Sequence, residues 1–516
     1  MRRFQRVILF RNYSNQVPPA AANISSISLA KKITYPDRPK NRTQLKTFIS
    51  RYSSNLQPGE RKTASLEDEH ILCGRVVSKI RKLSSNLIFF HIESQGDEIQ
   101  ILADRTCYDE RNFDNDHSSL KRGDIICAQG FPGKTKKGEL SLVTTKTTVL
   151  SPCLRDLPMG RGDGKYAVAD LNWMIKHREA SLIIGGEQLR KVFEQRNSIV
   201  QSIRQFLLSN SFLEVETPIL WPSAGGAFAK PFKTTSKNLT LRISPELPLK
   251  RLIVGGYEKV FEIGKVFRDE GISQKHNPEF TSIELYSAFS NADDLKEMTK
   301  NLFLHVYDNL YPNQQGNRVT SEYFVNFNSD FPEISVANEL EKFGKFKFDD
   351  ENSLVPENIL PLLNEKTRAS LKSESELTSI PRLLDKLIGQ EIESQLDPKI
   401  PTFLCDHPVV LSPLAKERSD RKGVCERFEL FAGGFELCNA YSELNDPRVQ
   451  RERFSQQLKF KLQGDDECQL PDEDFCQSLE FGMPPCAGWG LGIDRFVMIM
   501  LGKHSIRDVV FFPFDG

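Results

Sequence analysis

The 516-residue chain has no apolar run near the roughly 18 residues that a membrane-spanning helix needs, so we expect no membrane span. It also lacks net charge by formal count, because 69 Lys and Arg residues balance 69 Asp and Glu residues. Any nucleic-acid site must therefore be a local patch. Its ten cysteines include no CxxC pair and no Cys/His ligand spacing, which argues against a zinc site or a disulfide framework and favours reduced thiols.

Acidic residues are missing from the first 36 positions. The basic residues of that stretch are Arg2, Arg3, Arg6, Arg11, Lys31 and Lys32. In "MRRFQRVILFR" they alternate with apolar residues in an amphipathic helical pattern, which is typical of a mitochondrial transit peptide. We therefore expect residues 1–30 to be a transit peptide and basic arm that directs the protein to the mitochondrial matrix. A disordered basic tail is the alternative, and a secretory signal fits less well because the apolar stretch is short.

Residues 31–66 are rich in Ser, Pro, Asn and Lys and indicate a linker or arm. Short strand-like segments separated by turns then fill residues 67–152, and their spacing predicts a small five-stranded barrel. Strand alternation places Phe89 of "LIFFHI" and Gln100 of "EIQIL" opposite the apolar positions. An exposed aromatic ring and an amide on one barrel face suit single-stranded bases. Scattered surface residues on a spacer barrel are the alternative.

Residues 153–185 give no clear pattern and are expected to be an inter-domain linker. Residues 186–516 predict an α+β domain, in which helices flank a mostly antiparallel sheet. Its expected elements are a long amphipathic helix at 187–210, a strand at 211–220 whose pairing stops at Pro218, strands over 239–289, a helix-rich segment at about 292–400, strands over 402–443, a charged helix at 447–463 and a final strand and helix.

Two strand-like runs, "KVFEIGKVFRDE" and "TSIELYSAF", bracket a loop with many charged residues. With a period of two, Arg268 and Glu270 lie opposite the apolar face of the first run, and Glu284 and Tyr286 lie opposite that of the second. "GWGLGIDR" adds alternate glycines before Arg495, which would permit close approach of a planar or phosphate-bearing ligand. Each motif alone is weak, and a hairpin with a polar solvent face is the alternative.

Together these motifs resemble the class II aminoacyl-tRNA synthetases. "FLEVETP", "FRDEGI…HNPEFT" and "GWGLGIDR" are similar to motifs 1, 2 and 3 of that class. "GGAFAKPF", "LRISPELPLKRLIVGGYEKVFEIGKVF", "CDHPVVLSPLAK", "RFELFAGGFELCNAYSELNDP" and "GDDE" resemble the lysyl-tRNA synthetases within it. "LIFFHIE" and "LKRGDIICAQGFPGKTKKGELSL" are similar to the family's N-terminal anticodon-binding domain, an OB-fold. The resemblance covers residues 70–150 and 186–516 and implies ATP-dependent lysine activation and charging of tRNA(Lys) by a homodimer.

The resemblance also implies site residues. Arg268, Glu270 and Arg495 would be catalytic. ATP would contact Arg268, His276, Phe280, Glu429, Glu436, Gly492 and Arg495. Glu429 and Glu436 would also hold Mg²⁺. Lysine would contact Gly226, Glu246, Arg268, Glu284, Tyr286, Asn439, Tyr441 and Glu443. The anticodon would be read by Arg81, Phe89 and Gln100.

The proposed pocket suits a lysine side chain, because a desolvated ammonium needs carboxylate partners, and Glu284 and Glu443 can supply the charge. A pocket for aspartate would need a basic residue instead. An aspartyl- or asparaginyl-tRNA synthetase, and a catalytically silent relative that binds tRNA or a partner, remain the alternatives.

Two departures from the family pattern bear on the structure. Strict alternation puts Glu436 out of phase with Asn439, so we expect a bulge or bend near Leu437–Cys438. The stretch 160–185 lacks the Arg- and Tyr-rich segment usual in the family. Contacts between domains or across the dimer are therefore not predicted from it.

Overall fold

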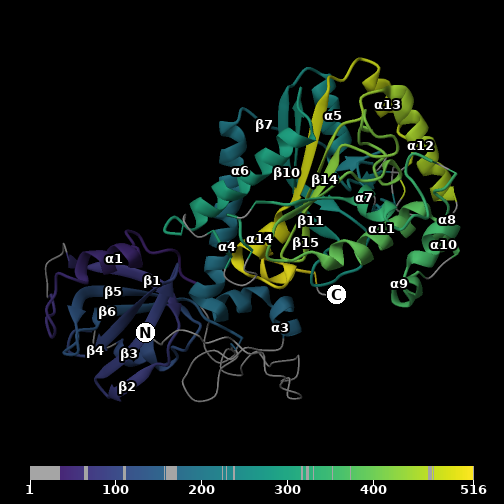
Figure 1. Cartoon of the computed structure of the whole chain (residues 1–516). Helices are drawn as coiled ribbons and strands as arrows, with labels where there is room; N and C mark the ends of the chain where they lie inside the picture. The colour runs from purple at the N-terminus through teal and green to yellow at the C-terminus, as the bar shows by residue number, and fades with distance from the viewer. Residues whose placement is uncertain are drawn as a thin grey trace. The chain divides into compact units, whose positions relative to one another are not determined.

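The computed structural model describes residues 35–62, 68–108, 112–155, 157, 171–222, 225–227, 229–235, 239–314, 318–320, 325–328, 330–350, 352–371, 374–462, 468 and 470–514. They form two compact units, divided between Arg190 and Lys191 (Figure 1). The expected transit peptide at 1–30, much of the expected linker at 153–185 and the "GDDE" segment lie outside the described residues. None of the helices in the described ranges is long and apolar enough to cross a membrane.

The described residues of the first unit form a barrel and three short helices, and the start of a longer helix. Its elements are α1 (Leu45–Tyr52), β1 (His70–Val76), β2 (Arg81–Ser84), β3 (Leu87–Ser94), β4 (Asp97–Asp104), α2 (Phe113–Ser118), β5 (Ile125–Lys134), β6 (Leu140–Ser151) and α3 (Leu171–Lys176). The strands follow the order β1-β5-β6-β4-β3, and β1 also pairs with β3, so that five strands close the barrel. This confirms the five-stranded OB-fold, and β2 is an additional short strand paired with β3.

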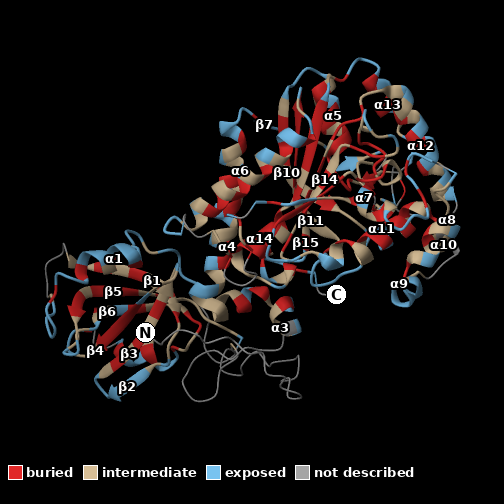
Figure 2. Ribbon diagram, viewed as in Figure 1, coloured by how far each residue is buried: buried red, intermediate tan, exposed pale blue. Residues whose placement is uncertain are grey.

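Alternation builds the core of this barrel. In β1 and β3, buried residues alternate with partly exposed ones, and the buried set of β3 is Ile88, Phe90 and Ile92. The apolar side of α1 packs onto the same core through Leu45 and Phe48. Figure 2 shows the buried residues along the barrel strands and the exposed ones at β2. The barrel therefore has an apolar interior, and its more exposed residues lie on the outer face.

The second unit contains most of the helices and an eight-stranded sheet. Its elements are α4 (Arg178–Ser209), which begins in the first unit, β7 (Leu213–Glu214), β8 (Leu220–Trp221), β9 (Thr240–Leu241), α5 (Glu246–Val254), β10 (Lys259–Phe267), β11 (Glu279–Ala288), α6 (Ala292–Leu310), β12 (Glu333–Ser335), α7 (Val336–Glu341), α8 (Pro356–Ile359), α9 (Glu365–Ser370), α10 (Glu374–Thr378), α11 (Ile380–Glu391), β13 (Thr402–Cys405), β14 (Arg427–Ala432), β15 (Phe435–Ser442), α12 (Pro447–Leu462), α13 (Glu473–Leu479), β16 (Cys486–Gly492) and α14 (Ile493–Leu501). Gly186 interrupts α4 with φ 49°, so the amphipathic helix expected from residue 187 begins directly after this kink.

The sheet has the strand order β12-β13-β14-β15-β16-β11-β10-β7. The outermost pairs, β12–β13 and β10–β7, are parallel and the pairs between them are antiparallel, as predicted. One face packs against α4, α6 and α14, with Ile283 and Leu285 of β11 in that core. Because successive side chains alternate between faces, Glu284 and Tyr286 lie on the opposite face. The active-site candidates are therefore on the side of the sheet that these three helices leave free.

The segment 211–289 differs from the sequence prediction at two places. The strands expected over 239–289 are interrupted by α5, because the apolar text "LPLKRLIV" forms a helix whose Leu247, Leu249 and Ile253 are buried. Of the strand expected over 211–220, only the two-residue β7 and β8 form, but the pairing of β7 with β10 does end before Pro218, as predicted. Pro218 lies between β7 and β8 and lacks the backbone N–H that a continuous ladder would use.

Candidate active site

A cavity of about 420 Å³ runs along β11 on the face of the sheet opposite α4, α6 and α14. Its wall includes every second residue of the strand, namely Phe280, Ser282, Glu284 and Tyr286. Six strand residues span about 20 Å, so Phe280 and Tyr286 mark two separate ends of one elongated cavity. The predicted phase of this strand is confirmed, and it provides both an aromatic end and an acidic end.

The glycines of β16 leave room for this cavity. In the sheet register, Gly488 lies opposite Tyr286, Gly490 opposite Glu284 and Gly492 opposite Ser282. A Cβ atom added at Gly488 would lie 2.1 Å from Glu443 Oε1, which only a rearranged side chain could tolerate. A Cβ atom at Gly492 would meet no other atom within 4 Å. Gly488 thus permits close packing at the acidic end, and Gly492 leaves open space at the other end.

The aromatic end carries cationic side chains. The guanidinium carbon of Arg268 lies 5.1 Å from the centre of the Phe280 ring, and Arg495 Nη2 lies 2.9 Å from His276 Nε2. Desolvation and the Arg495 charge lower the pKa of His276, so its imidazole is neutral near neutral pH. Glu270 is exposed in the loop after β10 and also lines the cavity. Planar guanidinium groups beside a ring suit a nucleotide, with phosphates near the arginines and a base on the ring.

The expected irregularity in β15 is present. Leu430 pairs with Cys438, whereas the next residue, Phe431, pairs with Glu436, so Leu437 is an extra residue opposite this step. The bulge changes the phase of the strand, and Glu436 consequently lines the same cavity as Asn439. Sequence alternation alone would have put these two side chains on opposite faces.

Of the two candidate metal ligands, Glu429 has its negative charge compensated more strongly than Glu436. It accepts a hydrogen bond from Arg427 Nη2 at 2.5 Å, and its other oxygen lies 3.4 Å from His407 Nε2. Burial would raise the pKa of Glu429, but His407 and Arg427 lower it to about 2, so this carboxylate is ionised. Arg495 Nη1 lies 3.6 Å from Glu436 Oε2.

The two carboxylates fit a magnesium ion only with further ligands. No group of three or more His, Cys, Asp or Glu side chains is placed to hold a metal within the described ranges. Mg²⁺ is commonly bound by one or two carboxylates together with substrate phosphates and water. Glu429 and Glu436 in the cavity wall therefore suit an ion that arrives with a nucleotide.

At the acidic end, Glu284 is held by neutral donors. Ser244 Oγ lies 2.8 and 3.0 Å from its two oxygens, and the Tyr286 hydroxyl donates to Oε2 at 3.3 Å. Desolvation and the neighbouring Glu246 charge raise the pKa of Glu284 to about 8. This carboxyl group is therefore largely protonated near neutral pH, and an incoming cation would favour its ionised form.

Glu246 lies beside it at the start of α5. The hydroxyl of Tyr441 is 2.8 Å from both of its oxygens. Gly226 has φ 89°, and a Cβ atom there would lie 2.8 Å from the Cβ of Glu246, so glycine fits this place best. Asn439 accepts a hydrogen bond from Arg427 Nε at 3.1 Å. The structure thus brings these predicted lysine-site residues to one end of the cavity.

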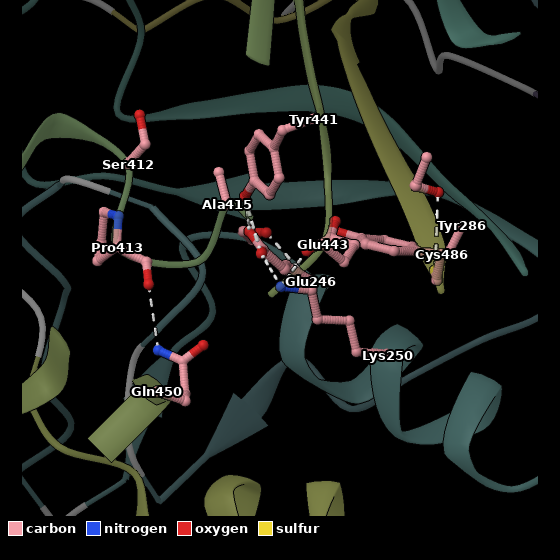
Figure 3. Close-up of polar contacts among 12 residues, drawn as sticks. Glu246, Lys250, Tyr286, Ser412, Pro413, Ala415, Tyr441, Glu443, Gln450 and Cys486 are labelled. Carbon is pink, nitrogen blue, oxygen red and sulfur yellow. Dashed lines mark hydrogen bonds and ion pairs between the residues drawn. The ribbon is translucent and has the colours of Figure 1, made fainter. Parts of the chain in front are cut away.

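Glu443 differs from the expectation, because it is buried behind the cavity wall and does not line it. Its carboxylate pairs with the ammonium of Lys250, which also donates to Glu246 Oε1 at 2.7 Å (Figure 3). Lys250, Ser244 and Arg427 were not predicted as site residues. The four-residue spacing of Glu246 and Lys250 would have suggested their pairing only if α5 had been recognised as a helix.

The barrel places its three predicted anticodon residues on one outer face. Arg81 lies opposite Phe89 in the β2–β3 pairing, Phe89 lies opposite Leu102 of β4, and Gln100 is two residues before Leu102. Arg81 is exposed and Phe89 half-buried, but Gln100 is only 7% exposed. Its amide oxygen accepts a hydrogen bond from Ser141 Oγ at 2.8 Å, so Gln100 lies on the predicted face but is largely buried there.

Two family models match the chain. Residues 173–516 match the class II tRNA synthetases for D, K and N, and residues 71–150 match an OB-fold nucleic acid binding domain. The two matches cover the sheet domain with its cavity and the barrel.

Individual relatives resemble the chain over most of its length. Lysine–tRNA ligase cla4 of Cladosporium cladosporioides is 39% identical over 93% of this chain and 80% of its own length. A probable cytoplasmic lysine–tRNA ligase of Encephalitozoon cuniculi is 41% identical over 89% of this chain and 90% of its own length. A lysine–tRNA ligase of Campylobacter jejuni subsp. doylei is 37% identical over 93% of both chains.

Proposed function

Because the chain belongs to the lysine–tRNA ligases of class II, we propose that its cavity activates lysine with ATP and that the activated lysine passes to tRNA(Lys) in mitochondrial translation. The main support is that one cavity has guanidinium groups and a phenyl ring at one end and buried carboxylates at the other. The first end suits ATP, and the second suits a diamino acid. Arg268 lines the same wall and would contact both the α-phosphate and the lysine carboxylate.

In the proposed reaction, an oxygen of the lysine carboxylate attacks the α-phosphorus of ATP, and pyrophosphate leaves. No side chain needs to act as nucleophile, so the chain contributes by positioning its substrates and by stabilising charge. Arg268 holds the two reacting groups in line, Arg495 and His276 contact the outer phosphates, and Phe280 stacks on adenine. Mg²⁺ held by Glu429 and Glu436 would neutralise phosphate charge. The terminal ribose hydroxyl of tRNA then attacks the carbonyl of the adenylate.

The direct test is ATP–pyrophosphate exchange with lysine, aspartate and asparagine as separate substrates. We expect exchange with lysine, because the acidic end offers carboxylates for an ammonium group. Exchange driven by aspartate or asparagine instead would assign the chain another substrate. Absence of exchange with pure, folded protein would favour a catalytically silent relative.

We also propose that residues 1–30 direct the protein to mitochondria. The support is the run of Arg and Lys without Asp or Glu. A fluorescent fusion of the full chain should co-localise with mitochondria, and a fusion that begins at residue 31 should not. Equal distribution of the two fusions would contradict the assignment.

A homodimer is proposed to form along the edge of the sheet at β7. That edge strand and the residues near it expose several large apolar side chains: Leu208, Leu213, Ile219, Leu220 and Tyr257. An exposed apolar sheet edge favours pairing with a second copy. Sedimentation at micromolar concentration should give a dimer, and Leu213→Asp should shift it toward monomer. A monomeric parent chain would contradict the proposal.

For tRNA recognition, we propose that the outer face of the barrel with Arg81 and Phe89 binds the anticodon. Its support is a half-buried ring beside an exposed guanidinium, a combination that stacks and holds single-stranded bases. Gln100 would contribute through the amide nitrogen, since its oxygen already accepts a hydrogen bond from Ser141.

A further inference from the structure

A fully buried ammonium group lies next to the acidic end of the cavity. The side chain of Lys250 has no exposed surface and does not line the cavity. Its Nζ donates to Glu246 Oε1 at 2.7 Å and pairs with the carboxylate of Glu443. Figure 3 shows this ammonium between the two carboxylates, with the hydroxyl of Tyr441 directed at Glu246. The mechanism described above makes no use of this lysine.

Glu246 and Glu443 differ in the interactions that they make besides the one with Lys250. Glu246 lines the cavity and also accepts a hydrogen bond from Tyr441. Glu443 lies behind the wall, and within the described part of the chain the contact with the Lys250 ammonium is what compensates its carboxylate. A buried carboxylate without its counter-ion is strongly unfavourable. Lys250 therefore links a residue of the cavity wall to a charge directly behind that wall.

We propose that Lys250 is a positioning residue for lysine recognition: its ammonium fixes the place and the charge of Glu246 and Glu443, and so determines how strongly the site prefers a substrate with an ammonium group on its side chain. This inference rests on the proposed assignment of the acidic end to lysine. Without Lys250, two neighbouring carboxylates would share a desolvated space, and proton uptake would remove the negative charge that attracts the substrate.

The surroundings support this reading. The titratable groups that face Lys250 or its two carboxylates come from α5, β11, β15 with its following residue, and β16: Glu246, Glu284, Tyr286, Tyr441, Glu443 and Cys486. Burial opposes the charge of Lys250, but Glu246 and Glu443 raise its pKa above the usual value. Burial raises the pKa of Glu443, and Lys250 opposes that change. The lysine is thus a permanent cation in a group of acids and phenols.

The test replaces Lys250 with methionine in the full-length protein and measures lysine- and ATP-dependent pyrophosphate exchange across pH. We expect the KM for lysine to rise by at least about tenfold, because proton uptake by the two carboxylates removes charge that attracts the substrate, while the KM for ATP stays within about twofold. The kcat/KM for lysine should also reach half its maximum at higher pH. If Lys250 had only a structural role, the variant would change the KM for lysine and the KM for ATP equally, and the pH dependence of kcat/KM for lysine would stay the same.

Lys296→Met is the matched control. Lys296 likewise joins two carboxylates, Asp293 at 3.1 Å and Glu333 at 2.6 Å, but none of the three lines the cavity. This variant should keep the parent KM for lysine. An equal rise in both variants would overturn the inference.

A second variant, Lys250→Met with Glu443→Gln, removes the buried charge that the single change leaves unpaired and should fold more stably than Lys250→Met. Its KM for lysine should remain raised. A parent-like KM in either variant would overturn the inference, and so would failure of both to fold, because Lys250 would then be a structural residue. If the parent protein shows no lysine-dependent exchange, the proposed function fails instead.

Discussion

Lysine binding should release a proton, because burial and the Glu246 charge raise the pKa of Glu284 to about 8. With a pKa of about 8, roughly nine tenths of this carboxyl is neutral at about pH 7. A substrate ammonium beside it favours the ionised form, so the proton must leave as lysine binds. The affinity for lysine should therefore rise as pH increases from about 6 to about 8, by up to about tenfold per pH unit, and level off above.

Titration calorimetry in two buffers of different ionisation enthalpy measures this release directly. At about pH 7 we expect nearly one proton per lysine, and less as the pH approaches about 9. Glu284→Gln should abolish the release and weaken lysine binding far more than ATP binding. Equal losses for lysine and ATP would refute the pocket assignment, and a parent protein that releases no proton and shows a constant affinity over this range would refute the reasoning about Glu284.

Three further predictions concern other parts of the protein. Phe280→Ala should raise the KM for ATP roughly tenfold in pyrophosphate exchange and change the KM for lysine little, because it removes a stacking surface. An equal rise of both KM values would contradict this role of Phe280. Gly488→Ala should lower the free energy of unfolding by about 1–3 kcal/mol in denaturant titration, since the new Cβ atom would meet Glu443 and Tyr286; unchanged stability would contradict the close packing. Phe89→Ala should raise the KM for tRNA in aminoacylation and leave lysine-dependent exchange intact, and a parent-like KM would exclude Phe89 from anticodon binding.

The sequence predicted correctly which face of the sheet a side chain lies on, wherever the period of two of a strand determines it. The alternation along β11 predicted that Glu284 and Tyr286 share the face opposite the core, and the conflict of phase at Glu436 predicted a bulge. Both follow from local geometry, because the period of a strand is fixed. The chain's resemblance to its family supplied the remaining candidate residues.

What sequence could not supply were contacts that depend on packing between distant elements. Lys250 lies in α5, whose dense apolar residues were interpreted as strand, and its pairing with Glu443 joins segments almost 200 positions apart. The burial of Gln100 depends on Ser141 of the neighbouring β6, which the pattern of β4 alone cannot reveal. Tertiary context overrides local pattern in both cases.

Lysine-dependent ATP–pyrophosphate exchange, followed by charging of tRNA, is the decisive measurement of whether one cavity joins ATP to lysine. The pure, folded protein should catalyse exchange with lysine but not with aspartate or asparagine, and the same preparation should charge mitochondrial tRNA(Lys). Folded, pure protein that shows no exchange with lysine, or exchange with another of the three amino acids, would contradict this prediction.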